Sequence, residues 1–279
     1  MSEFSTASCG GYPTVSDTFG AALWSVDYAL QMSVVGYSAA YLHTRERNVS
    51  YNLFSYPGDG VDGWITKPVY YSYFPILQGL QSNNGSRVID LGLSNNSAAG
   101  YGIYDSKTSE LYRIILINYQ DGDGPVDFAI PAASSPRAGG GKNATVKFLT
   151  ATSVHEGSNI SWSGMTWNGV EDGKPVASGQ DADLTGVDIS GPYAVKIPSP
   201  GLAVVMFEKN LPAGEPSGGG NSSNPSTGSN STGDTNTNTT GDANNGGSSS
   251  GGGNSSALSV DVSIVAALGA VFVGALVLN

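Results

Sequence analysis

The chain runs Leu111-Tyr-Arg-Ile-Ile-Leu-Ile-Asn118 near its middle and Leu202-Ala-Val-Val-Met-Phe207 further on, and these two apolar runs decide its fold. A short, nearly unbroken run of aliphatic residues predicts a strand that is buried on both faces. In residues 126–130 and 144–148 apolar and polar side chains alternate, which is typical of strands with one buried face. Glycine-rich turns separate these segments. About seven or eight short strands between turns predict an antiparallel β-sandwich over residues 85–210.

Residues 1–84 follow a different pattern, in which helices and strands alternate. The stretch Ser16-Asp17-Thr18 predicts the start of a helix with Ser16 as its N-cap. Apolar residues then recur at helical spacing along one face. They are Phe19, Leu23, Val26 and Leu30. Gly36 is expected to end this helix, and residues 37–43 predict a short buried strand.

A second helix is predicted from about Thr66, with Pro68 in its first turn and a bend at Pro75. Its apolar surface is expected from Val69, Tyr70, Phe74, Leu77 and Leu80. Alternating helices and strands indicate βα units and a parallel sheet. Two such units neither close a barrel nor cover both faces of a sheet. We therefore expect residues 1–84 to expose apolar surface unless a missing partner covers it.

The overall composition excludes several classes of protein. Lys and Arg number 12 against 23 Asp and Glu, which gives a net charge of −11 and excludes electrostatic binding of nucleic acid. A single cysteine excludes a disulfide scaffold, and two histidines leave little for metal chemistry. We expect neither a metal nor a cofactor. Both His43 and His155 are interpreted as structural histidines whose nitrogens are satisfied.

The end of the chain has no composition for a core. Residues 211–256 are rich in Gly, Ser, Asn and Thr, so they predict a disordered linker. Residues 257–279 form an apolar tail, for which three interpretations stay open: a buried helix, a short transmembrane anchor, or a glycosylphosphatidylinositol (GPI) anchor signal. The third is favoured, because small residues, a polar spacer and an apolar end follow one another. Candidate attachment sites lie near Gly253, Asn254 and Ser255.

Sequons for N-glycosylation agree with an extracellular, cell-surface location. Those outside the linker lie at Asn48, Asn84, Asn95, Asn143 and Asn159. The first residues, in contrast, contain no signal peptide, because they have neither a basic start nor an apolar core. We therefore expect the beginning of the protein to be missing from this chain, through truncation or a mispredicted gene start.

The N-terminal residues carry a resemblance to a known family. Ser2-Glu3-Phe-Ser-Thr-Ala-Ser-Cys-Gly10-Gly11-Tyr-Pro13 leads into Val15-Ser-Asp-Thr-Phe-Gly-Ala-Ala-Leu-Trp24-Ser-Val-Asp27. This segment resembles the nucleophile segment of glycoside hydrolase family 79, the heparanase and β-glucuronidase family, and most of all its fungal members. The resemblance implies the end of a (β/α)8 barrel over residues 1–84, followed by the family's C-terminal β-sandwich.

The resemblance also implies roles for three residues. Glu3 matches the catalytic nucleophile of a retaining glycosidase, which forms a covalent glycosyl-enzyme. Gly10 matches a glycine whose backbone N–H helps to bind the uronic-acid carboxylate. Tyr51 matches a tyrosine whose hydroxyl binds the same carboxylate. The implied partner is a uronic-acid-containing carbohydrate.

A retaining glycosidase needs a second carboxylate as its general acid and base. In family 79 it belongs to an Asn-Glu pair, and this chain contains no Asn-Glu pair. We therefore expect the C-terminal part of a secreted β-glucuronidase-like enzyme that is inactive alone. The alternative is a surface-anchored carbohydrate-binding or structural β-sandwich. In that alternative, aromatic residues such as Trp162 and Trp167 could stack on sugars, although packing in the core is the role we favour for both.

Overall fold

A computed structural model of the chain describes residues 3–58, 60–93, 95–122, 124–130, 143–169, 173–180, 182–190 and 193–207. The predicted linker and tail lie outside these ranges. In the front part the elements are α1 (Phe19–Val34), β1 (Phe54–Ser55), β2 (Ile65–Thr66), the 3₁₀ helix η1 (Pro68–Ser72) and α2 (Tyr73–Leu80). No helix among the described residues is both long enough and apolar enough to cross a membrane.

The strands that follow pair antiparallel throughout the described residues. They are β3 (Ser86–Asp90), β4 (Ala98–Asp105), β5 (Leu111–Asn118), β6 (Val126–Ile130), β7 (Asn143–Thr150), β8 (Ser161–Trp162), β9 (Met165–Thr166), β10 (Val176–Ala177), β11 (Leu184–Asp188), β12 (Tyr193–Ile197) and β13 (Gly201–Phe207). Within the described ranges, one nine-stranded sheet has the order β10-β9-β8-β7-β13-β5-β4-β3, with β11 also paired to β7. A second sheet pairs β12 with β6.

The central strands of the large sheet divide their side chains between two cores. On β5 and β13, Ile115, Ile117, Leu202 and Val204 face the helices. Their neighbours Leu116, Ala203 and Val205 face the β6–β12 sheet. Since successive residues of a strand point to opposite faces, a continuous apolar run is what two cores require. The antiparallel β-sandwich and its doubly buried central strands are therefore confirmed.

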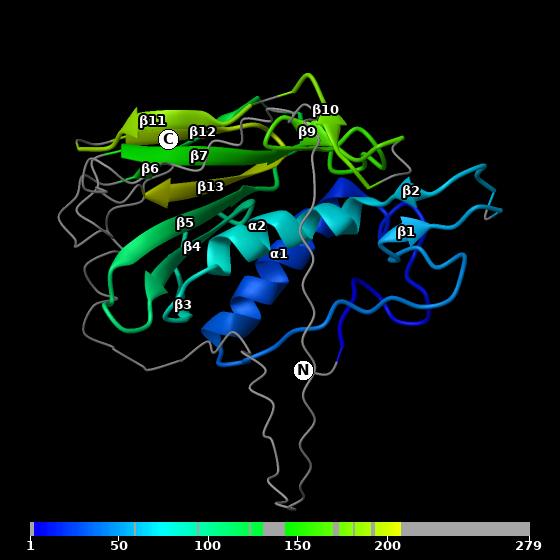
Figure 1. The fold of residues 1–279 in the computed structure, drawn as a ribbon, viewed down its shortest axis with the longest axis horizontal. Coiled ribbons are helices and arrows are strands. Elements are labelled where there is room, and N and C mark those ends of the chain that lie inside the picture. The colour runs from blue at the N-terminus through cyan, green and yellow to red at the C-terminus, as the bar shows by residue number, and fades with distance from the viewer. Residues whose placement is uncertain are drawn as a thin grey trace, which may run out of the picture. The chain divides into compact units, whose positions relative to one another are not determined.

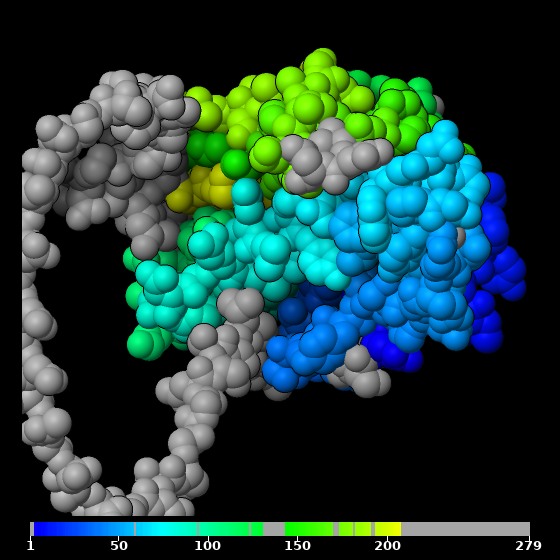
Figure 2. Space-filling model, turned by 45° about the vertical axis from the view of Figure 1, so that its right-hand side comes forward, coloured from blue at the N-terminus to red at the C-terminus, as the bar shows by residue number. Residues whose placement is uncertain are grey.

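Helix α1 lies across the face of the large sheet that β6 and β12 leave free (Figure 1). Its predicted apolar face is confirmed, because Phe19, Leu23, Val26 and Leu30 are all fully buried. The front part is packed directly against the strands (Figure 2). The expectation of exposed apolar surface therefore fails for α1. Exposed apolar side chains are found in other segments of residues 1–84, for example Tyr12, Val15, Trp64 and Leu77.

The predicted start of α1 is wrong by two residues. Thr18, rather than Ser16, is the N-cap, and its hydroxyl accepts a hydrogen bond from the Ala21 N–H. Ser16 is buried instead, and its Oγ accepts hydrogen bonds from the Tyr12 N–H and the Thr6 hydroxyl. The serine therefore stabilises the preceding loop, and the threonine stabilises the helix. Gly36, with a φ of 93°, follows the helix as predicted.

Two further predictions for the front part need correction. Residues 37–43 form no buried strand: only Leu42 pairs, in a parallel bridge with Phe4, and Tyr37 and Tyr41 are exposed. A strand needs a partner along its length, and Phe4 is the only residue paired with this segment in the described ranges. The second helix begins as the 3₁₀ helix η1 at Pro68, and Leu77 points to solvent. The barrel end therefore stays a prediction.

Candidate active site

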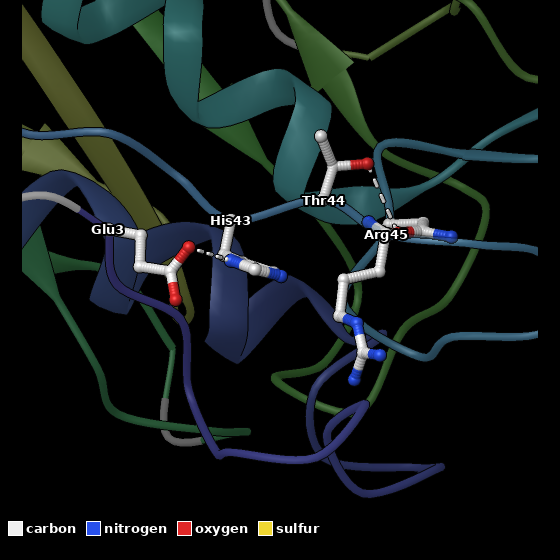
Figure 3. A network of polar contacts seen from close by, with 5 residues as sticks. Glu3, His43, Thr44 and Arg45 are labelled. Atoms are coloured by element: carbon white, nitrogen blue, oxygen red, sulfur yellow. Dashed lines mark hydrogen bonds and ion pairs between the residues drawn. The ribbon is translucent and has the colours of Figure 1, made fainter.

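The parallel bridge between Phe4 and Leu42 places Glu3 beside His43. The Phe4 N–H donates to the Tyr41 carbonyl at 2.9 Å, and the His43 N–H donates to the Phe4 carbonyl at 2.8 Å. These two bonds fix the register of the two segments. As a result, Oε2 of Glu3 lies 2.5 Å from Nδ1 of His43 (Figure 3).

An open pocket of about 400 Å³ surrounds this pair. Its lining consists of Glu3, Phe4, Ser5, Ala7, Ser8, Cys9, His43, Arg45 and Tyr51. Glu3 is the only carboxylic acid in that lining, and its side chain is 63% exposed. The pocket therefore offers an accessible carboxylate beside an imidazole, a guanidinium and a phenol.

Tyr51 reaches the pocket from a loop that several polar contacts hold in place. The tyrosine is only 3% exposed, and its ring meets that of His43 edge-on with centroids 5.6 Å apart. Nζ of Lys67 donates to the carbonyls of Val49 and Ser50, each at 3.2 Å. Among the described residues no hydrogen bond of the Tyr51 hydroxyl is seen. These contacts fix the backbone that directly precedes Tyr51.

Gly10 lies next to the pocket rather than in its lining. Its carbonyl accepts a hydrogen bond from the Ser50 N–H at 2.9 Å, so its loop is tied to the loop of Tyr51. At the neighbouring Gly11 φ is +78°, and a Cβ would lie 3.0 Å from Cδ1 of Tyr51 and 2.7 Å from Oγ of Ser16. Glycine is therefore required at position 11 for the two loops to approach each other.

Sequence reasoning missed two residues of this site. His43 is not a satisfied structural histidine, because its Nε2 is buried without a partner in the described part of the chain. Asn52, almost fully buried, accepts hydrogen bonds from the Thr44 hydroxyl and the Arg45 N–H and donates to the Glu46 carbonyl. It thereby holds the loop between His43 and Tyr51. The signal for His43 was its place at the end of the segment predicted to form a short strand, but nothing in the sequence indicated that this segment lies beside Glu3.

Trp162 and Trp167 belong to the core, the role that we favour for both. Trp162 is buried and stacks on Phe74, with ring centroids 6.2 Å apart. Trp167 stacks on the same ring at 4.4 Å. Because their faces pack on Phe74, these rings support helix packing, and no observation favours the alternative of a carbohydrate-binding module.

The sequon asparagines all reach the surface to some extent. Asn48, Asn143 and Asn159 are exposed, whereas Asn84 and Asn95 are half-buried. Nδ2 of Asn84, the atom to which a glycan attaches, donates to Oδ2 of Asp105 at 2.9 Å. Glycosylation of the five residues stays a prediction.

Part of the chain is similar to known proteins. Residues 100–204 match the glycosyl hydrolase family 79 C-terminal beta domain. A β-glucuronidase of Aspergillus niger is 26% identical over 71% of this chain and 39% of its own length. A β-glucuronidase of Neurospora crassa is 29% identical over 60% of this chain and 35% of its own length.

A solved structure shares the fold. The 4-O-α-L-rhamnosyl-β-D-glucuronidase from Fusarium oxysporum, in its Rha-GlcA complex, matches 74% of this chain and 42% of its own with a TM-score of 0.58 and 22% identity. The two chains thus share a fold over most of the present chain. The resemblance to family 79 is confirmed, since residues 100–204 of the β-sandwich match that family's C-terminal beta domain and two β-glucuronidases are similar to the chain. The chain spans less than two fifths of the length of the two β-glucuronidases.

Proposed function

We propose that this chain supplies the nucleophile and part of the sugar site of a retaining β-glucuronidase. The observation that carries the proposal is the pocket in which Glu3, His43 and Tyr51 meet. The similarity to two β-glucuronidases supports glucuronides as the substrate class. The parallel bridge at Phe4, with α1 after one of its segments and α2 after the other, supports a barrel end over residues 1–84.

The chemistry follows from the carboxylate. An oxygen of Glu3 attacks the anomeric carbon, the glycosidic bond breaks, and a covalent glucuronosyl ester forms. The Tyr51 hydroxyl donates to the carboxylate of the sugar, and a hydrogen bond to a charged group is one of the stronger kind. The backbone N–H of Gly10 is proposed as a second donor. We also propose that the protein is secreted and N-glycosylated. Residues 211–256 would then link the folded part to a membrane anchor that the apolar tail specifies.

The chain alone should not turn over a nitrophenyl β-D-glucuronide in steady state. A retaining enzyme places its acid/base carboxylate about 5 Å from the nucleophile, and the pocket lining contains no acid besides Glu3. Release of nitrophenolate by the purified chain, followed by absorbance, should equal the rate in buffer. Sustained release that disappears in Glu3→Gln would contradict this expectation.

Replacing Tyr51 by Phe should weaken the binding of D-glucuronate to the chain about tenfold or more, because one hydrogen bond to a charged group is lost. Binding is measured by calorimetry or by NMR titration, with D-glucose as the uncharged comparison. Tyr41→Phe is the matched control, since Tyr41 is exposed and does not line the pocket. Equal glucuronate affinity of wild type and Tyr51→Phe would remove Tyr51 from the site.

A further inference from the structure

The contact between His43 and Glu3 is built by the backbone rather than by chance rotation of two surface side chains. Hydrogen bonds on both sides of Phe4 fix the two segments side by side. Phe4 itself is buried and packs against Trp24 and Tyr28 of α1, with ring centroids 6.0 and 5.1 Å away. The carboxylate and the imidazole are therefore presented to each other by a rigid support.

The hydrogen-bonding state of the imidazole follows from its partner. An ionised carboxylate can only accept, so Nδ1 of His43 carries the hydrogen and donates it to Oε2 of Glu3. The other ring nitrogen, Nε2, is buried and has no partner among the described residues. Burying an unpaired ring nitrogen is unfavourable. Apart from its edge-on contact with the Tyr51 ring, the imidazole has one interaction among the described residues, the hydrogen bond to Glu3.

No other cation in the described part of the chain contacts Glu3. Arg45 lines the same pocket, but its guanidinium pairs with Glu46 at 2.9 Å. His43 is thus the one group that holds the Glu3 side chain. The side chain of His43 is 25% exposed, against 63% for Glu3. The less exposed imidazole therefore holds the more exposed carboxylate.

We propose that His43 is a positioning residue that holds Oε2 of Glu3 and thereby presents Oε1 as the attacking oxygen. This inference rests on the proposed function and deepens it. In the glycosylation step, Oε1 forms a bond to the anomeric carbon while the bond from that carbon to the leaving oxygen breaks, and the leaving group takes the electron pair. The Nδ1 hydrogen stays on His43 throughout. Preorganising one oxygen removes the need to order the carboxylate during the reaction.

The test uses the whole chain and dinitrophenyl β-D-glucuronide. Dinitrophenolate is a good leaving group and departs without a general acid, so the chain should become glucuronosylated once although it cannot turn over. The rate of ester formation is followed by intact-protein mass spectrometry. His43→Gln, which moves the amide away from the position of Nδ1, should slow it about 10- to 100-fold. His43→Asn, whose amide nitrogen occupies the position of Nδ1, should retain a rate within about threefold of wild type.

A second measurement separates this inference from the proposed function. In proton–nitrogen correlation spectra of the imidazole rings, Glu3→Ala should shift the Nδ1 signal of His43 and leave that of the exposed His155 unchanged. Wild-type rates of ester formation in a folded His43→Gln chain would overturn the positioning role while the proposed function stands. No ester on the wild-type chain would overturn the proposed function, whatever the spectra show. An unchanged His43 signal in Glu3→Ala would overturn the contact itself.

Discussion

Replacing Glu3 by Gln should reduce the release of dinitrophenolate from dinitrophenyl β-D-glucuronide by at least about 1,000-fold. Glutamine has the shape of glutamate, and its amide oxygen can still accept the hydrogen bond from Nδ1 of His43, so the pocket is expected to stay intact. What is lost is the nucleophile, because an amide does not form the glycosyl ester. The effect is large because the whole chemical step depends on this one oxygen.

The experiment measures the burst of dinitrophenolate per mole of chain by stopped-flow absorbance. Wild type should release about one equivalent and then stop, since the pocket lining contains no second carboxylate to act as the base that hydrolyses the ester. Glu46→Gln is the matched control: the Glu46 side chain is 64% exposed, about the same as the 63% of Glu3, but it does not line the pocket. A burst that is equal in Glu3→Gln and wild type would exclude Glu3 as the nucleophile.

Replacing Asp27 by Ala should lower the free energy of unfolding of the chain by about 3 kcal/mol. Asp27 lies on the side of α1 that faces the sheet, where it accepts hydrogen bonds from the hydroxyls of Tyr101 and Tyr119. Burial, followed by the nearby Asp27 carboxylate, raises the pKa of both tyrosines, so both hydroxyls remain donors. Without the carboxylate, the two hydroxyls would keep only longer contacts, such as those of Tyr101 to Oε1 of Gln31 at 3.3 Å and of Tyr119 to the Leu23 carbonyl at 3.5 Å.

Urea unfolding followed by tryptophan fluorescence measures this loss. In a chain that already carries Tyr101→Phe and Tyr119→Phe, Asp27→Ala should lower the free energy of unfolding by clearly less, because both hydrogen-bond donors to Asp27 are already absent. A loss below about 0.5 kcal/mol in the wild-type background would show that the network does not hold α1 to the sheet. Since α1 also carries the rings that pack on Phe4, its detachment should loosen the pocket as well.

The β-sandwich was predictable because its central strands have to be apolar on both faces. In Ile114–Ile117 each successive side chain enters the opposite core, and no helix or single-faced strand has that pattern. The apolar face of α1 was predictable for the same reason: four residues at helical spacing need a surface to cover them. What the local pattern did not reveal was that the sandwich itself provides this surface.

The errors lie where a residue's role depends on distant partners. Ser16 and Thr18 are both good N-caps in isolation, and only the fold of the preceding loop decides that Ser16 binds Thr6 and Tyr12. In the same way, the role of His43 depends on the register with which its segment pairs at Phe4. The register between two segments about 40 residues apart is a long-range property. The position of the imidazole beside Glu3 is therefore seen only in the folded chain.

The most direct test of the central claim is to identify the residue that becomes esterified. After reaction of the chain with dinitrophenyl β-D-glucuronide, acid quenching and proteolysis, tandem mass spectrometry locates the added glucuronosyl group. We expect a single ester, on Glu3. An ester on another residue, or a chain that gains no glucuronosyl group, would contradict the assignment of Glu3 as the nucleophile.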